Sequence, residues 1–155
     1  MYDYAHDEET TRFVFPTHQS VEDTKNSIAN YFMSAPLGKY GIELKENQQF
    51  IGTIDLRVQE NEDNAEIGYA LNKNYWGRGF VPEASQALIK LGFEELNLVR
   101  IFAYHDAENP KSGRVMEKLG MKKEGIIPDA RRFKGKIVSV VLRGLTRQEW
   151  QAGRS

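Results

Sequence analysis

The apolar positions of this chain follow two different periods, and each change of period predicts a new element. Apolar residues that recur three or four positions apart form one side of a helix. The first predicted helix is Ser20–Met33, whose apolar stripe is Val21, Ile28 and Phe32. The second begins near Val81 and carries Ala84, Leu88 and Leu91 on the same side. The third is Lys111–Leu119. Ser20 can cap the first of these helices, and Gly120 can end the last in a left-handed conformation.

Between the helices, apolar residues follow the shorter period of β-strands. The predicted strands are Tyr40–Lys45, Phe50–Val58, Ala65–Leu71, Val99–His105, Met121–Ile127 and Lys136–Leu145. Turn-compatible residues 46–49 separate the first two strands, which therefore form a predicted hairpin. A predicted loop that carries Arg131, Arg132 and Lys134 joins the last two strands. This order of strands and helices is a mixed α/β layout.

Composition narrows the class of protein. The 155 residues are 40% hydrophobic, which fits one folded domain over residues 1–155. The net charge of −1 provides no global positive field for nucleic acid or an anionic membrane, so neither is expected as a partner. Without cysteine, the chain has no disulfide, thiolate metal site or cysteine nucleophile. No apolar run reaches membrane-spanning length and no signal peptide is evident, which favours a cytoplasmic protein.

The stretch Trp76-Gly77-Arg78-Gly79-Phe80 lies between a predicted strand and a predicted helix. Glycines let the backbone approach a ligand closely, and the N–H groups at a helix start favour an anion. The stretch therefore suits a phosphate or pyrophosphate, although an ordinary tight turn has the same composition. The dinucleotide-binding and P-loop fingerprints are both absent.

A second stretch begins at Asn109-Pro110-Lys111-Ser112 and continues through Arg114-Val115-Met116-Glu117-Lys118-Leu119-Gly120. Taken alone, Asn109 is a helix N-cap and Ser112 an incidental residue of the first turn. Together with Glu66-Ile67-Gly68-Tyr69 and the glycine stretch, in this order and at these separations, the pattern resembles the GNAT superfamily of acetyl-coenzyme A dependent N-acetyltransferases. Within it, the chain is most similar to the ribosomal-protein N-terminal (alanine/serine) acetyltransferases over its whole length.

The resemblance implies an α/β (α+β type) GNAT fold, with a central, mixed, mainly antiparallel sheet flanked by helices. It also implies a single domain over residues 1–155 that binds acetyl-coenzyme A between two separating strands. The implied cofactor-binding residues are Ile67, Tyr69 and Leu71 for the pantetheine arm, Trp76, Gly77, Arg78, Gly79, Phe80 and Val81 for the pyrophosphate, and Asn109. No metal is expected, because the three histidines are widely separated in the sequence.

The resemblance also implies the catalytic residues. Glu66 lies on the strand face opposite Ile67, where an exposed strand face is the ordinary interpretation, and the resemblance makes it the general base. Ser112 is the candidate that protonates the leaving thiolate, with Tyr104, His105 and Tyr69 as alternatives. His105 is also an alternative base.

The chain departs from the family pattern at two places. Asn74 stands at the first position of the glycine loop, where the family usually has Arg or Gln. Met1–Thr10 is similar to the end of the family's first helix, so the first strand is expected to be missing. Phe50–Leu56 would then be an exposed strand edge that favours a homodimer, unless Thr11–Phe15 covers it as a strand. Residues 6–9 are expected to be flexible surface.

The implied reaction is direct acetyl transfer to an amine. A peptide or protein N-terminal α-amino group is favoured as acceptor, because it is less fully protonated than a lysine near neutral pH. The alternatives are a small-molecule amine such as a polyamine or an antibiotic, a non-catalytic acyl-coenzyme A binding module, and a plain interaction domain.

Overall fold

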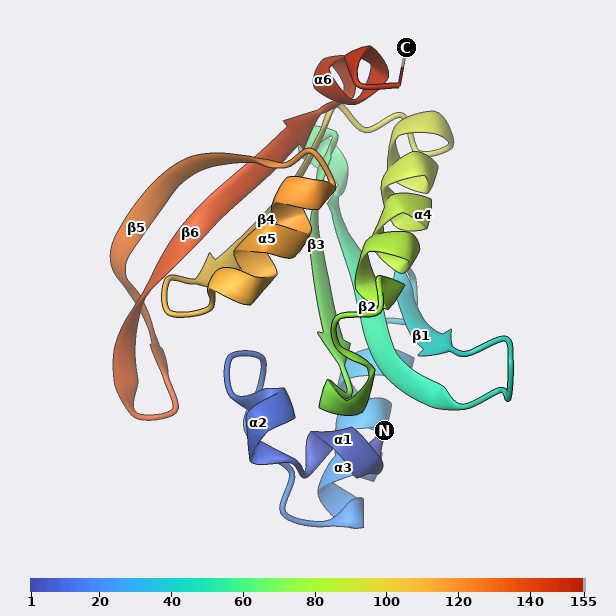
Figure 1. Ribbon diagram of the computed structural model, residues 1–155, viewed down its shortest axis with the longest axis vertical. Helices are drawn as coiled ribbons and strands as arrows, with labels where there is room; N and C mark the ends of the chain where they lie inside the picture. The colour runs from blue at the N-terminus through green and yellow to red at the C-terminus, as the bar shows by residue number, and fades with distance from the viewer. Residues whose placement is uncertain (155) are drawn as a thin grey trace. The chain divides into compact units, whose positions relative to one another are not determined.

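The computed structural model describes residues 1–154, so Ser155, the last residue of the predicted domain, lies outside the described residues. The described chain divides into two compact units, which are taken one at a time below. The first contains residues 1–55 and 69–80, and the second contains residues 56–68 and the chain from residue 81 onward. Strands β2 (Phe50–Gln59) and β3 (Asn64–Leu71) run through both units (Figure 1).

Six strands form one sheet in the order β1-β2-β3-β4-β6-β5. Strands β3 and β4 are parallel, whereas β1–β2, β4–β6 and β5–β6 are antiparallel. The remaining strands are β1 (Lys39–Glu43), β4 (Arg100–Asp106), β5 (Lys122–Phe133) and β6 (Lys136–Thr146). The predicted mixed, mainly antiparallel sheet with flanking helices is confirmed.

The first unit begins with helices rather than with a strand. Its helical segments are α1 (Tyr2–Ala5), α2 (Glu8–Thr11), α3 (Val21–Ser27), the π-helix η1 (Ile28–Met33) and the 3-10 helix η3 (Lys73–Tyr75). No strand precedes β1 among the described residues, as expected from the departure at the N-terminus. The predicted cap of α3 is confirmed, since the N–H of Asp23 donates to the Ser20 hydroxyl at 3.1 Å. The predicted apolar stripe is wrong at its start, because Val21 is 52% exposed.

Strands β1 and β2 form the predicted hairpin, with Lys39 opposite Asp55 and Glu43 opposite Phe50. Strand β2 lies between β1 and β3 in the sheet, so the prediction of an exposed edge at Phe50–Leu56 is wrong. Strand β1 is the edge strand at this end. Thr11 ends α2 and residues 12–15 form turns and a bend, so Thr11–Phe15 contains no strand and does not cover an edge in the predicted way.

The second unit contains the longer helices. They are α4 (Phe80–Glu94, whose first residue belongs to the first unit), α5 (Pro110–Lys118) and α6 (Arg147–Ala152), and a 3-10 turn, η2 (Glu60–Glu62), precedes β3. Both α4 and α5 pack on the face of β4 that carries Ile101 and His105. A Cβ added to Gly92 of α4 would lie 2.9 Å from Ile101, and one added to Gly113 of α5 would lie 3.0 Å from His105. These close approaches leave Phe102 and Tyr104 on the other face of the strand.

Strands β5 and β6 form a long hairpin that Figure 1 shows in orange and red. Its turn consists of Lys134 and Gly135, whose φ values are 52° and 79°. Two consecutive positive φ angles are typical of a two-residue hairpin turn. Arg131 and Arg132 therefore lie within β5, which corrects the prediction of a longer loop that carries them.

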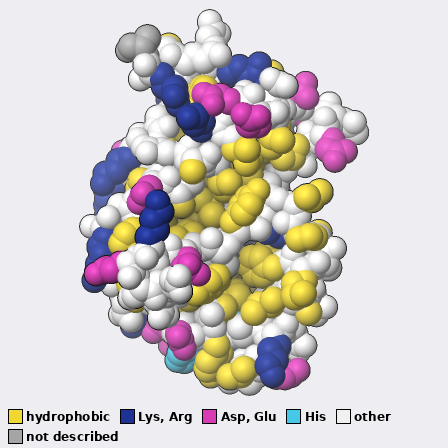
Figure 2. All heavy atoms as spheres, turned by 90° about the vertical axis from the view of Figure 1, so that its right-hand side faces the viewer, with side chains coloured by type: hydrophobic (Ala, Val, Ile, Leu, Met, Phe, Trp, Pro, Cys, Tyr) yellow, Lys and Arg dark blue, Asp and Glu magenta, His cyan; other side chains and the backbone are white. Residues whose placement is uncertain are grey.

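The surface mixes charge and apolar area. Figure 2 shows one face of the molecule, where hydrophobic side chains lie between basic and acidic ones. In the first unit, Leu37 and Met33 are the most exposed large hydrophobic residues, at 94% and 69%. No helix among the described residues is long and apolar enough to span a membrane.

Candidate active site

Both glycines of the loop in the first unit have a left-handed backbone conformation. Gly77 and Gly79 have φ values of 75° and 80°, which L side chains rarely adopt. A Cβ added to either glycine would meet no atom within 4 Å, so the space beside both is open. The loop is held from one side by Trp76, whose indole N–H donates to the carbonyl of Leu71 at 2.8 Å.

Three successive N–H groups of this loop are free to bind a ligand. Among residues 1–154, the backbone N–H groups of Gly77, Arg78 and Gly79 have no acceptor. They directly precede α4, whose first N–H groups and dipole add positive potential. The side chain of Arg78 is directed at the ring of Tyr75, 5.4 Å from its centroid. Such an arrangement of N–H groups can accept an anion such as a phosphate.

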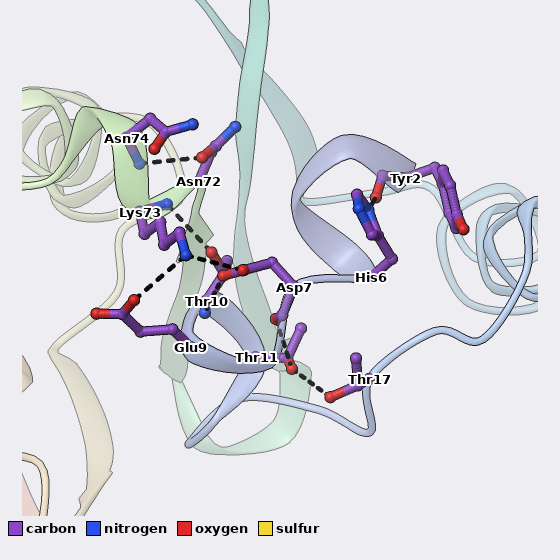
Figure 3. Close-up of polar contacts among 10 residues, drawn as sticks. All are labelled: Tyr2, His6, Asp7, Glu9, Thr10, Thr11, Thr17, Asn72, Lys73 and Asn74. Atoms are coloured by element: carbon purple, nitrogen blue, oxygen red, sulfur yellow. Dashed lines mark hydrogen bonds and ion pairs between the residues drawn. The ribbon is translucent and has the colours of Figure 1, made fainter.

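An ion-pair cluster anchors the start of the loop (Figure 3). The ammonium of Lys73 lies 2.9 Å from a carboxylate oxygen of Asp7 and 3.3 Å from Glu9, and its backbone N–H donates to the hydroxyl of Thr10 at 3.2 Å. Asp7 also caps α2 by accepting the N–H of Thr10 at 2.7 Å. Hydrogen bonds from Lys73 and Thr10 lower the pKa of Asp7 from 3.8 to about 2.

Sequence reasoning missed this cluster. Residues 6–9 were expected to be flexible surface, which is wrong for Asp7 because it is held at two sites. The partners Asp7 and Lys73 are 66 positions apart, and no local pattern links them. The one available signal was Asp7 itself, three residues before Thr10, which has the spacing of a helix cap.

In the second unit, strands β3 and β4 separate beside Glu66. Their parallel pairing runs from Asn64 opposite Arg100 to Glu66 opposite Phe102 and continues no further among the described residues. Both strands go on, to Leu71 and Asp106. The predicted separation of these two strands is confirmed from Ile67 onward.

The side chain of Glu66 is held by an arginine of the neighbouring strand. The guanidinium of Arg57 donates to a carboxylate oxygen of Glu66 at 2.6 Å, and the two side chains are 41% and 29% exposed. Because directly opposite residues share a face, Glu66 lies on the same face as Phe102 and, two residues on, Tyr104.

His105 is placed differently from Glu66. It is 8% exposed and lies on the helix-covered face of β4. Its Nε2 accepts the Nε–H of Arg143 at 3.2 Å, so the ring proton lies on Nδ1, which donates to the carbonyl of Asp106 at 2.9 Å. Both ring nitrogens are therefore engaged, which argues against His105 as the base.

Helix α5 carries the last two predicted residues. Asn109 is its N-cap and accepts the N–H of Ser112 at 3.4 Å, with Pro110 as the first helical residue. Asn109 and Ser112 are both half-buried. The cap uses the amide oxygen of Asn109 and leaves its NH₂ group for a ligand.

The predicted site residues are therefore divided between the two units. Glu66, Ile67, Val81, Asn109 and Ser112 belong to the second unit, and Tyr69, Leu71, Trp76, Gly77, Arg78, Gly79 and Phe80 belong to the first. Ile67 and Leu71 are buried, at 2% and 7% exposure, and Tyr69 is half-buried. In the described part of the chain, no group of three or more His, Asp or Glu side chains could hold a metal ion.

The first unit contains the glycine loop before a helix, and the second contains a carboxylate where the pairing of two parallel strands ends. The sequence model of the acetyltransferase (GNAT) domain matches residues 1–122. The chain therefore belongs to the GNAT family of acetyltransferases, which transfer an acetyl group from acetyl-coenzyme A to an amine.

Two relatives illustrate the range of similar proteins. An uncharacterized N-acetyltransferase of Bacillus licheniformis, p20, is 34% identical over 152 residues, or 95% of this chain and 85% of the relative. The [ribosomal protein uS5]-alanine N-acetyltransferase of Escherichia coli is 32% identical over 117 residues, or 74% of this chain and 60% of that protein. The predicted class of enzyme, an N-acetyltransferase, is confirmed.

Solved structures agree with the fold. A GNAT acetyltransferase from Bacillus anthracis has a TM-score of 0.86 at 28% identity and covers 96% of this chain and 87% of its own. The spermidine N-acetyltransferase of Vibrio cholerae, in complex with CoA and spermine, has a TM-score of 0.79 at 17% identity and covers 97% and 89%. The second likeness concerns the fold alone.

Proposed function

We propose that this enzyme acetylates the α-amino group at the N-terminus of a peptide or protein, with ribosomal proteins as the first candidates. The observation that carries the proposal is the position of Glu66, a carboxylate held by Arg57 at the point where the pairing of β3 and β4 ends. An amine that enters between the strands on that face would meet a proton acceptor there.

The residues of the glycine loop fit the phosphates of acetyl-coenzyme A. The N–H groups of Gly77, Arg78 and Gly79 would hold the pyrophosphate, with Trp76, Phe80 and Val81 shaping the loop and the helix start. Ile67, Tyr69 and Leu71 of β3 would follow the pantetheine arm, and the free amide NH₂ of Asn109 would bind it. When bound, acetyl-coenzyme A supplies an acetyl thioester.

The chain's own residues would move two protons. Glu66 would accept a proton from the acceptor ammonium, directly or through a water, and leave the nitrogen a free electron pair. Arg57 would hold the carboxylate of Glu66 in place for this step. Ser112 would donate a hydrogen bond to the departing thiolate, with Tyr104 as the other candidate. Transfer is direct, since no cysteine is present to carry an acetyl thioester.

The chemistry of the amine favours an α-amino acceptor. With a pKa of about 7.7–8, roughly a tenth of such groups is unprotonated near pH 7, compared with roughly one in 2,500 for a lysine of pKa about 10.4. A modest base such as a partly exposed carboxylate is therefore sufficient. The similarity to an enzyme named for the alanine of ribosomal protein uS5 supports the same choice.

A polyamine is the second candidate. The exposed acidic residues Glu60, Glu62 and Asp63 precede β3 and could attract a polycation. The solved structures with this fold include a spermidine N-acetyltransferase.

An amine panel read by release of free coenzyme A separates the candidates. It contains a tetrapeptide with N-terminal alanine, one with N-terminal serine, an Nα-blocked lysine peptide and spermidine. The highest kcat/KM is expected with the free N-termini, and a higher value with spermidine would replace the proposal by its alternative.

A further inference from the structure

The C-terminal part of the chain is strongly segregated in charge. Between Gly125 and Gln148 it contains six basic residues and a single acidic one, Asp129. Four of the basic residues fall within residues 131–136: Arg131, Arg132, Lys134 and Lys136. These four, together with Phe133, are named the basic tip. The net charge of the whole chain is near zero, but this part of the chain has a local excess of positive charge.

The basic tip lies at the end of a two-stranded ribbon that extends past the rest of the sheet. Pairing between β4 and β6 ends at Asp106 opposite Val140, whereas pairing between β5 and β6 continues to Phe133 opposite Lys136. The four basic residues are all exposed. Arg131 and Arg132 are neighbours on opposite faces of the ribbon and both are exposed, so both faces are open to a partner there.

The cations of the basic tip occupy both faces of the ribbon. Arg131 lies opposite Val138, and Phe133 lies opposite Lys136, which places Arg131, Phe133 and Lys136 on one face. Arg132 lies opposite Ile137 on the other face, and Lys134 lies in the turn. The guanidinium of Arg131 and the ammonium of Lys134 lie 5.1 and 5.4 Å from the centroid of the Phe133 ring.

For three of the four cations, no carboxylate of the described residues neutralises the charge. Within residues 1–154, Arg131, Arg132 and Lys136 form no ion pair. Asp129 is the one acidic residue in this part of the chain, and its backbone N–H donates to the hydroxyl of Ser139 at 3.1 Å. By contrast, Arg143 further along β6 pairs with Glu117 at 3.2 Å. Arg131, Arg132 and Lys136 therefore differ from Arg143 in having no such partner among the described residues.

We propose that the basic tip docks this enzyme on RNA through the phosphate backbone. Cations on both faces and in the turn fit a polyanion whose charges lie on more than one side of the ribbon, as phosphates do across a groove. An extended acidic peptide would contact one face only. The choice of RNA rests on the proposed function, because the N-termini of ribosomal proteins are presented beside ribosomal RNA. Contacts to phosphates do not distinguish one base from another, so binding should be independent of the RNA sequence.

Fluorescence anisotropy with a labelled RNA hairpin of about 20 base pairs tests the proposal. If about four phosphates are contacted, affinity should fall about 50- to 150-fold between 50 and 200 mM salt. In the variant Arg131→Gln/Arg132→Gln/Lys136→Gln, affinity at 50 mM salt should fall at least tenfold, and the slope of log affinity against log salt should decrease by about 3. The matched control Lys25→Gln/Lys45→Gln/Lys90→Gln removes the same charge from exposed positions and should bind like the wild type.

Three results would overturn the proposal. The first is equal loss in both triple variants, since the whole-molecule charge would then explain binding. The second is an absence of RNA binding by the wild type at 50 mM salt. The third is tighter binding of a decaglutamate peptide than of the RNA, which would make the partner an acidic protein. Acetylation of a free tetrapeptide is measured alongside and should be unchanged in both variants. If the wild type binds RNA but does not acetylate the tetrapeptide, the result contradicts the proposed acceptor and still supports the RNA-docking surface.

Discussion

Glu66 is an ordinary exposed-strand glutamate by its sequence position, and its surroundings make it a candidate base. If it removes a proton from the acceptor amine, Glu66→Gln should lower kcat by about 10²- to 10⁴-fold. The loss should be largest at low pH, where more of the amine is protonated. Rates across pH 6–9 with a peptide acceptor measure this.

Two variants control for that result. Glu95→Gln removes an exposed carboxylate to which no role is assigned and should leave the rate unchanged, and Ser112→Ala should cost less than Glu66→Gln. In all three, acetyl-coenzyme A should still raise the melting temperature as in the wild type. Wild-type turnover in Glu66→Gln at neutral pH would remove Glu66 from the mechanism.

Asp7 is the second residue whose surroundings predict a measurable effect. Its pKa is lowered from 3.8 to about 2 by Lys73 and Thr10, so the folded state binds a proton less tightly than the unfolded state. The stabilisation is present above about pH 4 and is lost as the pH falls toward 2. Asp7→Asn keeps a capping side chain and removes the charge. Its melting temperature should lie below that of the wild type above pH 4, and the difference should disappear near pH 2.

The neighbouring Glu8→Gln serves as the control for Asp7→Asn. Glu8 forms no ion pair among the described residues, so its removal should give no such pH-dependent difference. A difference between wild type and Asp7→Asn that is constant from pH 7 to pH 2 would contradict the ion pair with Lys73.

At the scale of elements, the close approach of β2 and β3 depends on a glycine within a strand. A Cβ added to Gly52 would lie 2.3 Å from the carbonyl oxygen of Ala70, and this backbone atom cannot move aside alone. Gly52→Ala should therefore lower the free energy of unfolding by about 1–3 kcal/mol. Urea unfolding measures this. Gly125→Ala in β5, where an added Cβ meets no atom within 4 Å, should change stability by less than about 0.5 kcal/mol. Equal stability of the two variants would contradict the strand spacing.

The whole molecule should respond to acetyl-coenzyme A by melting at a higher temperature. Ligand at about 100 times its Kd adds about 2.7 kcal/mol, which is about 5–10 °C for a chain of this size. Gly79→Val should abolish most of the shift, because its side chain would fill the space beside the loop and its φ of 80° disfavours a branched residue. Thermal melts with and without ligand measure this.

Gly135→Val is the matched control for Gly79→Val. Its φ of 79° and open surroundings are nearly the same, but it lies in the β5–β6 turn. It should destabilise the free protein to a similar degree and keep the full ligand shift. If Gly79→Val also keeps that shift, the glycine loop does not anchor the ligand.

Dimerisation of the whole molecule stays a prediction. Because β1 and not Phe50–Leu56 is the edge strand, the outer edge of β1 is now the expected contact surface. That strand is five residues long and has Lys39 and Glu43 at its ends. Short length and terminal charges weaken open-ended edge pairing and are compatible with a closed pair. Light scattering over a dilution series should show a dimer, and a monodisperse monomer at high concentration would contradict it.

Local sequence information was sufficient where local physics decides the structure. The helical and strand periods, the Ser20 cap and the turn between β1 and β2 all depend on residues within a few positions of one another. The order of motifs also sufficed for the family and for the class of reaction. The left-handed conformation predicted for Gly120 belongs here too, since its φ is 85°.

Tertiary structure alone decided which residues become partners across the chain. It made β1 the edge strand, ended the β3–β4 pairing at Glu66, and placed His105 on the face opposite Glu66. It also joined Lys73 to Asp7, in a segment whose composition suggested a flexible surface. The physical reason is the same in each case. Strand order and long-range ion pairs depend on the summed packing of the whole sheet and its helices, and no short window of sequence contains that sum.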